Sequence, residues 1–143
     1  MSQEFQAPRG TLDWYGARAA LRRAVLDAAR EVFEAAGYGQ VVTPTFEDTG
    51  VFARTSGEGS DVVRKEMYSF TDRSGRPLTL RPEGTAGVMR AYLEHMTRLP
   101  QPVKVWYEVP MFRYAAVQRG RYREHYQFGA RRSAPTTPRS TPS

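Results

Sequence analysis

Two long runs of β-type residues, at 103–114 and 121–128, are separated only by the loop 115–120. Both runs are rich in β-branched and aromatic residues, which is typical of strands. A connection this short can join two strands only in the antiparallel sense, because parallel strands need a crossover of a dozen or more residues. The chain must therefore form a long antiparallel hairpin, and other elements must cover at least one of its faces.

A long helix is predicted before these strands. Apolar residues recur at spacings of three and four over residues 17–36, which is the pattern of an amphipathic helix, and Gly37 follows as a stop signal. Arg22 falls on the polar side of this pattern. The predicted apolar face consists of Leu21, Val25, Ala28, Val32 and Ala36.

Shorter elements are expected between the helix and the long hairpin. Residues 40–43 predict a short strand that Pro44 ends, since proline cannot donate to a sheet ladder. This order of elements favours an α+β fold, with a mostly antiparallel sheet and flanking helices. The other expected segments are short pieces at 46–54, a loop at 55–60, a second hairpin of strands 65–71 and 76–81 around the turn 72–75, and a second helix that opens at 83–85, carries Val88, Tyr92, Met96 and Leu99, and ends at Pro100.

The positive charge is concentrated at the C-terminal end. The chain has 21 Lys and Arg against 15 Asp and Glu, a formal net charge of +6. Residues 130–143 hold three of the arginines and no acid, and removing these three leaves +3 for residues 1–129. Pro, Ser and Thr dominate the segment 130–143, a composition that predicts disorder. The basic balance therefore argues only weakly for a free-standing nucleic-acid-binding module, which would bind with steep salt dependence.

Several function classes are excluded by composition. The chain has no cysteine, so disulfide scaffolds, thiolate zinc sites and cysteine nucleophiles do not apply. No apolar run is long enough to span a membrane and no signal peptide is recognisable, so we expect a cytoplasmic protein without membrane contact. His95 and His125 are the only histidines and lack a matching carboxylate cluster, so no metal site is predicted. The sequence contains neither a phosphate-binding P-loop nor a legible Ser–His–Asp order.

Strand alternation sorts the long hairpin into two faces. Arg121, Arg123, His125 and Gln127 fall on one side of the second strand, and Arg113 shares a side of the first strand with Met111. If the register brings these sets together, three guanidiniums and an amide cover one face of the sheet. Such a face suits a phosphate or carboxylate ligand, because the arginine fork matches these anions bidentately.

An acidic residue is expected close to these arginines. Thr79, Arg81 and Glu83 alternate onto one face of the preceding strand, and Glu83 opens the second helix. Glu83 would then bind a substrate ammonium group beside the arginines, a combination that an amino acid and a nucleotide would require. The alternatives are an ordinary solvated basic hairpin and a Glu83 that only favours the positive end of its helix.

Four stretches of the chain form more specific motifs. They are 65–72 (KEMYSFTD), 80–86 (LRPEGTA), 111–114 (MFRY) and 120–123 (GRYR). These motifs resemble the histidyl-tRNA synthetase family, and the similarity runs from about Arg9 to Gly129. The resemblance implies a partial class II aminoacyl-tRNA synthetase catalytic core over 1–129, with motif 1 at about 17–46 and motif 2 at about 103–129.

The resemblance also implies an activity and its site. The family activates histidine with ATP and Mg²⁺ to histidyl-adenylate, transfers the histidyl group to tRNA(His), and forms homodimers through motif 1. Arg113 would be the catalytic residue, holding the ATP α-phosphate and the substrate carboxylate and stabilising charge in the transition state. Histidine would be bound by Glu83, Gly84, Thr85, Arg113 and Gln127, and ATP by Arg113, Arg121 and Arg123.

The chain departs from the family pattern at two places. Ala115-Ala116-Val117 stands where the family has Glu-Arg-Pro, and Ala130-Arg131 stands where the family has a hydrophobic residue and then a glutamate that binds the amino group. The motif 3 arginine and the anticodon-binding domain of the family lie further downstream, so we expect this fragment to be inactive alone. The alternative is a non-catalytic, synthetase-like regulatory subunit of ATP phosphoribosyltransferase in histidine biosynthesis.

The composition of residues 130–143 suggests a frameshift. Codons can be chosen for this segment that, read two bases further on, encode EAIGTDDPEIDAE, which resembles the continuation of motif 2 in the family. We therefore expect a frameshift, in the gene or in its sequencing, near the codon for Gly129.

Overall fold

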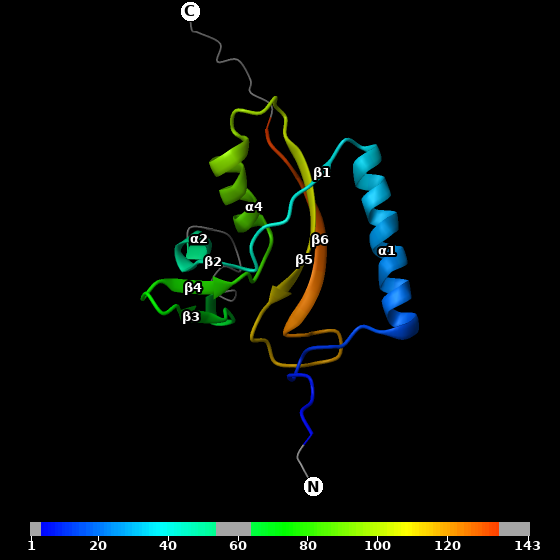
Figure 1. Ribbon diagram of the computed structural model, residues 1–143, viewed down its shortest axis with the longest axis vertical. Helices are drawn as coiled ribbons and strands as arrows, with labels where there is room; N and C mark the ends of the chain where they lie inside the picture. The colour runs from blue at the N-terminus through cyan, green and yellow to red at the C-terminus, as the bar shows by residue number, and fades with distance from the viewer. Residues whose placement is uncertain (1–3, 54–63, 135–143) are drawn as a thin grey trace, which may run out of the picture.

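The computed structural model describes residues 4–53 and 64–134. A hairpin of two long strands forms the centre, with one helix on each side of it (Figure 1). Helix α1 (Gly16–Ala35) covers one face of this hairpin, and helix α4 (Thr85–Ala91) lies on the opposite face. The expected α+β architecture is confirmed.

The central sheet has the strand order β1-β5-β6. Strands β5 (Lys104–Phe112) and β6 (Glu124–Arg132) pair in the antiparallel sense, as the short loop between them requires. Strand β1 (Gly39–Gln40) is shorter than the expected 40–43 and pairs with β5 in the parallel sense, so the sheet is mostly, but not entirely, antiparallel. The register places Gln127 opposite Val109 and Gly129 opposite Tyr107.

A second antiparallel sheet has the order β2-β4-β3. It contains β2 (Phe46–Asp48), β3 (Ser69–Thr71) and β4 (Pro77–Leu80), and helix α2 (Thr49–Ala53) follows β2 directly. The predicted hairpin is confirmed, with shorter strands. Its turn is closed by the Asp72 carboxylate, which accepts hydrogen bonds from the backbone N–H groups of Ser74 and Arg76.

Helix α1 agrees with the predicted boundaries, but a different face of the helix packs on the sheet. Gly37 ends the helix region at a φ of 86°, as expected of a glycine stop. Phe33 stacks on Trp106, with ring centres 5.6 Å apart, and Arg22 forms an ion pair of 2.6 Å with Glu108. The predicted apolar face is exposed instead, because the aromatic contact and the ion pair turn the helix toward the side that carries Arg22 and Phe33.

Helix α4 supplies the apolar contact on the other face. It continues into a π-helical turn, η1 (Tyr92–Met96), so the second predicted helix is confirmed, while Leu99 lies beyond it and is exposed. Ala86, Gly87, Val88 and Ala91 of α4 are buried, and Val88 packs against the sheet. The buried cluster between helix and sheet consists of Val88, Tyr107, Val109 and Met111.

Arg81 connects the two sheets. It follows β4 and is only 4% exposed. Its Nε donates to the carbonyl of Pro110 at 2.6 Å, and its Nη1 donates to the carbonyls of Thr43 and Pro44, both at 3.0 Å. One guanidinium therefore joins β5 to the segment between β1 and β2.

The last strand differs from its prediction at both ends. It begins at Glu124 instead of Arg121 and runs to Arg132. The expectation of disorder from Ala130 onward is therefore wrong for the first three residues of that segment, because they pair with residues 104–106 of β5.

Residues 135–143 and the predicted loop 55–60 lie outside the described residues. Within the described ranges, no helix has the length and hydrophobicity that crossing a bilayer requires.

Candidate functional site

Five of the seven predicted site residues lie at the α4 side of the central sheet: Glu83, Gly84, Thr85, Arg113 and Gln127. Gln127 and His125 lie opposite Val109 and Met111 in the β5–β6 ladder, so they share the sheet face that α4 covers. The register therefore brings His125 and Gln127 together with Met111, the arrangement on which the predicted face depended.

Arg113 lies immediately beyond the end of β5. Its Nε donates to the carbonyl of Pro82 at 2.9 Å, which brings the guanidinium to the residue before Glu83. Its backbone N–H donates to the carbonyl of Arg123, also at 2.9 Å. Within the part of the chain that the structure describes, only Nε of this guanidinium donates a hydrogen bond, so its two terminal nitrogens remain available as a fork for an anion.

Glu83, Gly84 and Thr85 form the start of α4. The Glu83 carboxylate accepts the backbone N–H of Thr85 at 2.6 Å and that of Ala86 at 3.0 Å. Gly84 allows the helix start to approach the sheet, because a Cβ at that position would lie 2.6 Å from the Tyr107 ring. The Glu83 carboxylate therefore has a capping role, which the sequence left open, and the residue before it, Pro82, accepts the hydrogen bond from Arg113.

Arg131 contacts this group from strand β6. Its Nη2 and Nε donate to the Thr85 hydroxyl oxygen at 2.6 and 3.2 Å. Its guanidinium carbon lies 5.7 Å from the centre of the Tyr107 ring. The sequence analysis placed residue 131 in a disordered segment and missed this contact. The signal was present, since Arg131 continues the alternation of Gln127 and Gly129 along one strand face.

The prediction that Arg121 and Arg123 share a strand face with Gln127 is wrong, because β6 begins after both arginines. Arg123 donates from Nε to the carbonyl of Ala115 and stacks over the Tyr114 ring at 4.1 Å. Arg121 is exposed and forms a long ion pair of 3.6 Å with Glu66. Both arginines therefore belong to the loop between β5 and β6.

Thr79 and Arg81 are buried and make hydrogen bonds inside the fold. The Thr79 hydroxyl is fully buried and bonds to the hydroxyls of Thr49 and Ser69, both at 2.8 Å. The Arg81 guanidinium donates its hydrogen bonds to backbone carbonyls, as described above. Of the three residues predicted to alternate toward a ligand, only Glu83 lies at the candidate site.

The electrostatics of His125 reflect its surroundings. Burial lowers the pKa of the His125 imidazole, and the positive charge of Arg113 lowers it further. The imidazole is therefore neutral at pH 7, and the charged groups of the site are Arg113, Glu83 and Arg131.

The depressed His125 pKa predicts a loss of stability in mild acid. The unfolded chain binds a proton near the ordinary histidine value of 6.5 and the folded chain binds it only at lower pH, so the free energy of unfolding falls as the pH drops below 6.5. We expect His125→Gln to remove part of this fall between pH 7.5 and 5.0 in urea denaturation. Equal profiles for the wild type and for His125→Gln would contradict the assignment.

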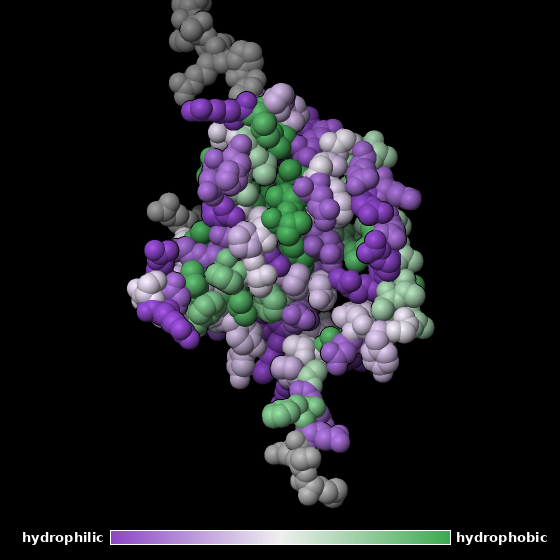
Figure 2. Space-filling model, in the orientation of Figure 1, coloured by the Kyte–Doolittle hydropathy of each residue, from purple (hydrophilic) through white to green (hydrophobic). Residues whose placement is uncertain are grey.

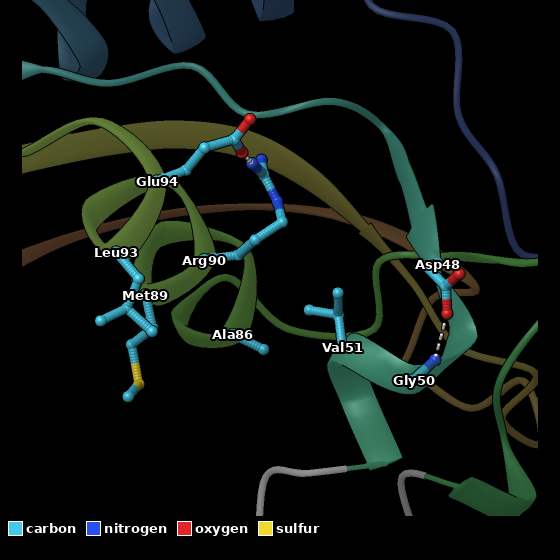
Figure 3. Close-up of a pocket in the computed structure, with 8 residues that line it drawn as sticks. All are labelled: Asp48, Gly50, Val51, Ala86, Met89, Arg90, Leu93 and Glu94. Carbon is cyan, nitrogen blue, oxygen red and sulfur yellow. Dashed lines mark hydrogen bonds and ion pairs between the residues drawn. The ribbon is translucent and has the colours of Figure 1, made fainter.

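A separate groove of about 690 Å³ lies between α2 and the α4–η1 helix, and no predicted site residue lines it. In Figure 3 the apolar side chains of α2 and α4 face this groove, and the Arg90–Glu94 ion pair lies at one end. We assign it no role. Its lining residues are Asp48, Gly50, Val51, Ala86, Met89, Arg90, Leu93 and Glu94.

The antiparallel hairpin, the helix start that faces it and the arginine between them make up part of a class II aminoacyl-tRNA synthetase catalytic core. A family model described as "Histidyl-tRNA synthetase" matches residues 10–133. The chain belongs to the histidyl-tRNA synthetase family.

Relatives and solved structures agree with this assignment. The chain is 51% identical to the histidine–tRNA ligase of Rubrobacter xylanophilus, over 88% of this chain and 32% of that protein. It is 53% identical to the histidine–tRNA ligase of Rhodococcus erythropolis, over 87% of this chain and 30% of that protein. The structure of apo Staphylococcus aureus histidyl-tRNA synthetase matches with a TM-score of 0.72 and 37% identity, over 89% of this chain and 32% of that one. The chain therefore spans about a third of the length of the relatives it matches.

Proposed function

We propose that this chain supplies the first part of the catalytic domain of a histidine–tRNA ligase, which activates histidine with ATP and transfers it to tRNA(His) in the cytoplasm. The observation that carries the proposal is the position of Arg113, whose Nε donates to the carbonyl of Pro82, the residue before Glu83, and whose two terminal nitrogens are left for an anion. The relatives named histidine–tRNA ligase support the same reaction.

The proposed roles follow from the geometry around Arg113. Its free guanidinium fork would hold the ATP α-phosphate and the histidine carboxylate, and would stabilise the negative charge that develops on the phosphate in the transition state. Glu83, Gly84, Thr85 and Gln127 would seat the histidine. Arg121 would contact ATP from its exposed loop position, and Arg123 would hold that loop through Tyr114 and Ala115.

ATP would bring Mg²⁺ to this site. Two arginine side chains, Arg113 and Arg121, present guanidinium groups that fit the phosphates of the nucleotide. Mg²⁺ supplies neutralisation of phosphate charge when it is bound with ATP. Within 4–53 and 64–134 there is no group of three or more His, Asp or Glu that could hold a metal, so the proposal assigns no protein ligands to the ion.

A chimera tests this function directly. Residues 10–129 of this chain would replace the matching segment of the Thermus thermophilus histidine–tRNA ligase, which is 51% identical over the region of similarity. We expect histidine-dependent ATP–pyrophosphate exchange by the chimera and its loss, by a factor of at least about 100, on Arg113→Ala. A folded chimera without exchange would contradict the proposal. We expect no measurable exchange from the 143-residue chain alone, because the relatives extend over three times its length.

The regulatory-subunit alternative has weaker support. A Bacillus halodurans structure titled as an ATP phosphoribosyltransferase regulatory subunit/histidyl-tRNA synthetase matches with a TM-score of 0.72, but at 24% identity. At that level the match concerns the fold only. The Rubrobacter xylanophilus and Rhodococcus erythropolis relatives, at 51% and 53% identity, are named histidine–tRNA ligases, which favours the ligase.

We also propose that α1 forms a homodimer interface, as the resemblance of 17–46 to motif 1 implies. Three large apolar side chains of α1 face solvent: Leu21 is 67% exposed, Val25 49% and Val32 68%. Figure 2 shows green, hydrophobic residues among purple ones along the side that α1 forms. A second copy of the chain would cover this surface.

Charge placed on the exposed α1 face should prevent self-association. The double variant Val25→Glu, Val32→Glu would bury two carboxylates in a dimer, so we expect a dimer-to-monomer shift in sedimentation velocity. Ala20→Glu is the control, because the helical repeat puts this exposed residue on another side of α1. A wild-type chain that is monomeric at 100 μM, or a double variant that remains dimeric, would rule out this interface.

A further inference from the structure

We infer that Gly10 is a positioning residue for Arg113, and that the N-terminal turn of residues 8–11 acts on the candidate site through the peptide group between Arg123 and Glu124. The inference rests on the proposed function, because it takes Arg113 as the residue that acts on ATP. It adds to the site a segment from which none of the predicted site residues comes.

The turn of residues 8–11 is closed by two hydrogen bonds to one oxygen. The Thr11 backbone N–H donates to the carbonyl of Pro8 at 3.1 Å, and the Thr11 hydroxyl donates to the same carbonyl at 2.6 Å. Gly10 is the third residue of the turn and has a φ of 82°, a conformation that favours glycine. In Figure 1 this N-terminal segment passes beside the loop that joins β5 to β6.

The Gly10 carbonyl accepts two consecutive backbone N–H groups, that of Arg123 at 2.8 Å and that of Glu124 at 3.2 Å. The Glu124 N–H belongs to the same peptide group as the Arg123 carbonyl. That carbonyl in turn accepts the backbone N–H of Arg113 at 2.9 Å. A single peptide group therefore joins the Gly10 carbonyl to the backbone of Arg113.

The Arg113 guanidinium is held from two sides. The Arg123 carbonyl holds its backbone, and the Pro82 carbonyl accepts from its Nε at 2.9 Å. Arg113 lies beyond the last pair of the β5–β6 ladder, which is Phe112 opposite Glu124, so the register of the strands does not fix it. A shift of the backbone at residue 123 would therefore move the guanidinium relative to the start of α4.

Gly10 also lies against the side chain of Arg123. A Cβ at residue 10 would lie 2.7 Å from Cγ, 2.9 Å from Cβ and 3.0 Å from the backbone nitrogen of Arg123. The far end of this side chain is fixed as well, because Nε donates to the Ala115 carbonyl at 3.2 Å and the guanidinium lies 4.1 Å from the centre of the Tyr114 ring. A larger residue at position 10 must therefore displace the backbone of Arg123 or the turn itself.

Gly10→Ala tests the inference in a chimera of residues 4–129 with the Thermus thermophilus ligase, which contains the whole turn. We expect kcat for histidine-dependent ATP–pyrophosphate exchange to fall about tenfold with KM for ATP within about twofold, because Arg113 acts on charge that develops in the transition state. Gly75→Ala is the matched control. Gly75 has a φ of 86° and a Cβ there meets nothing within 4 Å, so this variant also places alanine at a positive φ but should keep kcat within about twofold.

Coupling to Arg113 separates positioning from a general loss of structure. The Arg113→Ala chimera has no guanidinium to position, so Gly10→Ala should lower its residual exchange by less than about twofold. A purely structural effect would lower the rate by the same factor in both backgrounds. Thr11→Val is a milder variant that removes only the hydroxyl bond to Pro8. It should lower kcat about two- to threefold with the same dependence on Arg113, even where Gly10→Ala fails to fold.

Hydrogen exchange in the 143-residue chain tests the structural step without any activity. Gly10→Ala should speed amide exchange at Arg113 and Arg123 by at least about tenfold, and Gly75→Ala should leave both amides unchanged. Unchanged exchange at these amides in Gly10→Ala would overturn the inference, and so would equal kinetic losses in the two Arg113 backgrounds. A folded chimera without exchange would reject the proposed function together with this inference. An active chimera that Gly10→Ala leaves unchanged would retain the function and reject the inference alone.

Discussion

Arg81→Met is expected to destabilise the protein by about 3–5 kcal/mol, which is a large part of the stability of a small domain. The side chain is buried, and its guanidinium is the donor for the carbonyls of Thr43, Pro44 and Pro110. Methionine fills a similar volume but leaves these three oxygens without their donor. The side-chain part of the connection between the two sheets would be lost, which leaves only the backbone hydrogen bonds of residue 81 to Thr45 and Phe112, so both sheets should be destabilised.

Two further variants test whether the loss of stability is due to the buried guanidinium of Arg81. Arg81→Lys keeps the charge but has no planar fork, so we expect an intermediate loss of stability. Arg73→Met makes the same substitution at an exposed position in the hairpin turn and should change stability by less than about 0.5 kcal/mol. The measurement is urea denaturation followed by circular dichroism. A value for Arg81→Met close to that of Arg73→Met would show that the guanidinium does not hold the sheets together.

Gly84→Ala is expected to destabilise the protein by about 1–3 kcal/mol and to displace the start of α4 from the sheet. A Cβ at this position would lie 2.6 Å from Cε2 and 2.7 Å from Cζ of Tyr107. The ring cannot move away easily, because Gly129 closes its other side. The backbone of Gly84 has a φ of −94°, which alanine adopts readily, so the cost is steric.

A matched glycine and a compensating substitution test this explanation. Gly39→Ala in β1 meets nothing within 4 Å and should be neutral or slightly stabilising. Tyr107→Leu removes the distal ring atoms, so in the double variant Gly84→Ala should cost less than it does in the wild type. Additive losses of stability in thermal unfolding would mean that the alanine acts through something other than the ring.

Much of the secondary structure could be predicted because the responsible interactions are local. The spacing of apolar residues located α1 and the second helix, and the turn at 72–75 located the β3–β4 hairpin. The boundaries of β6 could not be predicted in the same way. The run 121–128 resembles a strand, but Arg123 donates its backbone N–H to Gly10, a contact with a distant segment, and the ladder begins only at Glu124.

The face of α1 that contacts the sheet shows a second limit of sequence reasoning. Periodicity selected the face of Leu21, Val25 and Val32. The structure packs the side that carries Arg22 and Phe33 on the sheet, because the sheet offers Glu108 and Trp106 at the matching positions. An amphipathic pattern predicts that a helix has an apolar face, but it does not predict which surface of the protein that face will contact.

The sequence by itself determined the family, through the resemblance of four short motifs, and the α+β class, through apolar periodicity and strand alternation, which are local signals. Only the tertiary structure decided what each charged residue does. Arg81 became a buried connector, Glu83 a cap beside Arg113, and Arg131 a donor to Thr85. The role of a charged side chain depends on the acceptors that distant segments bring within about 3 Å of it, and no local pattern contains that distance.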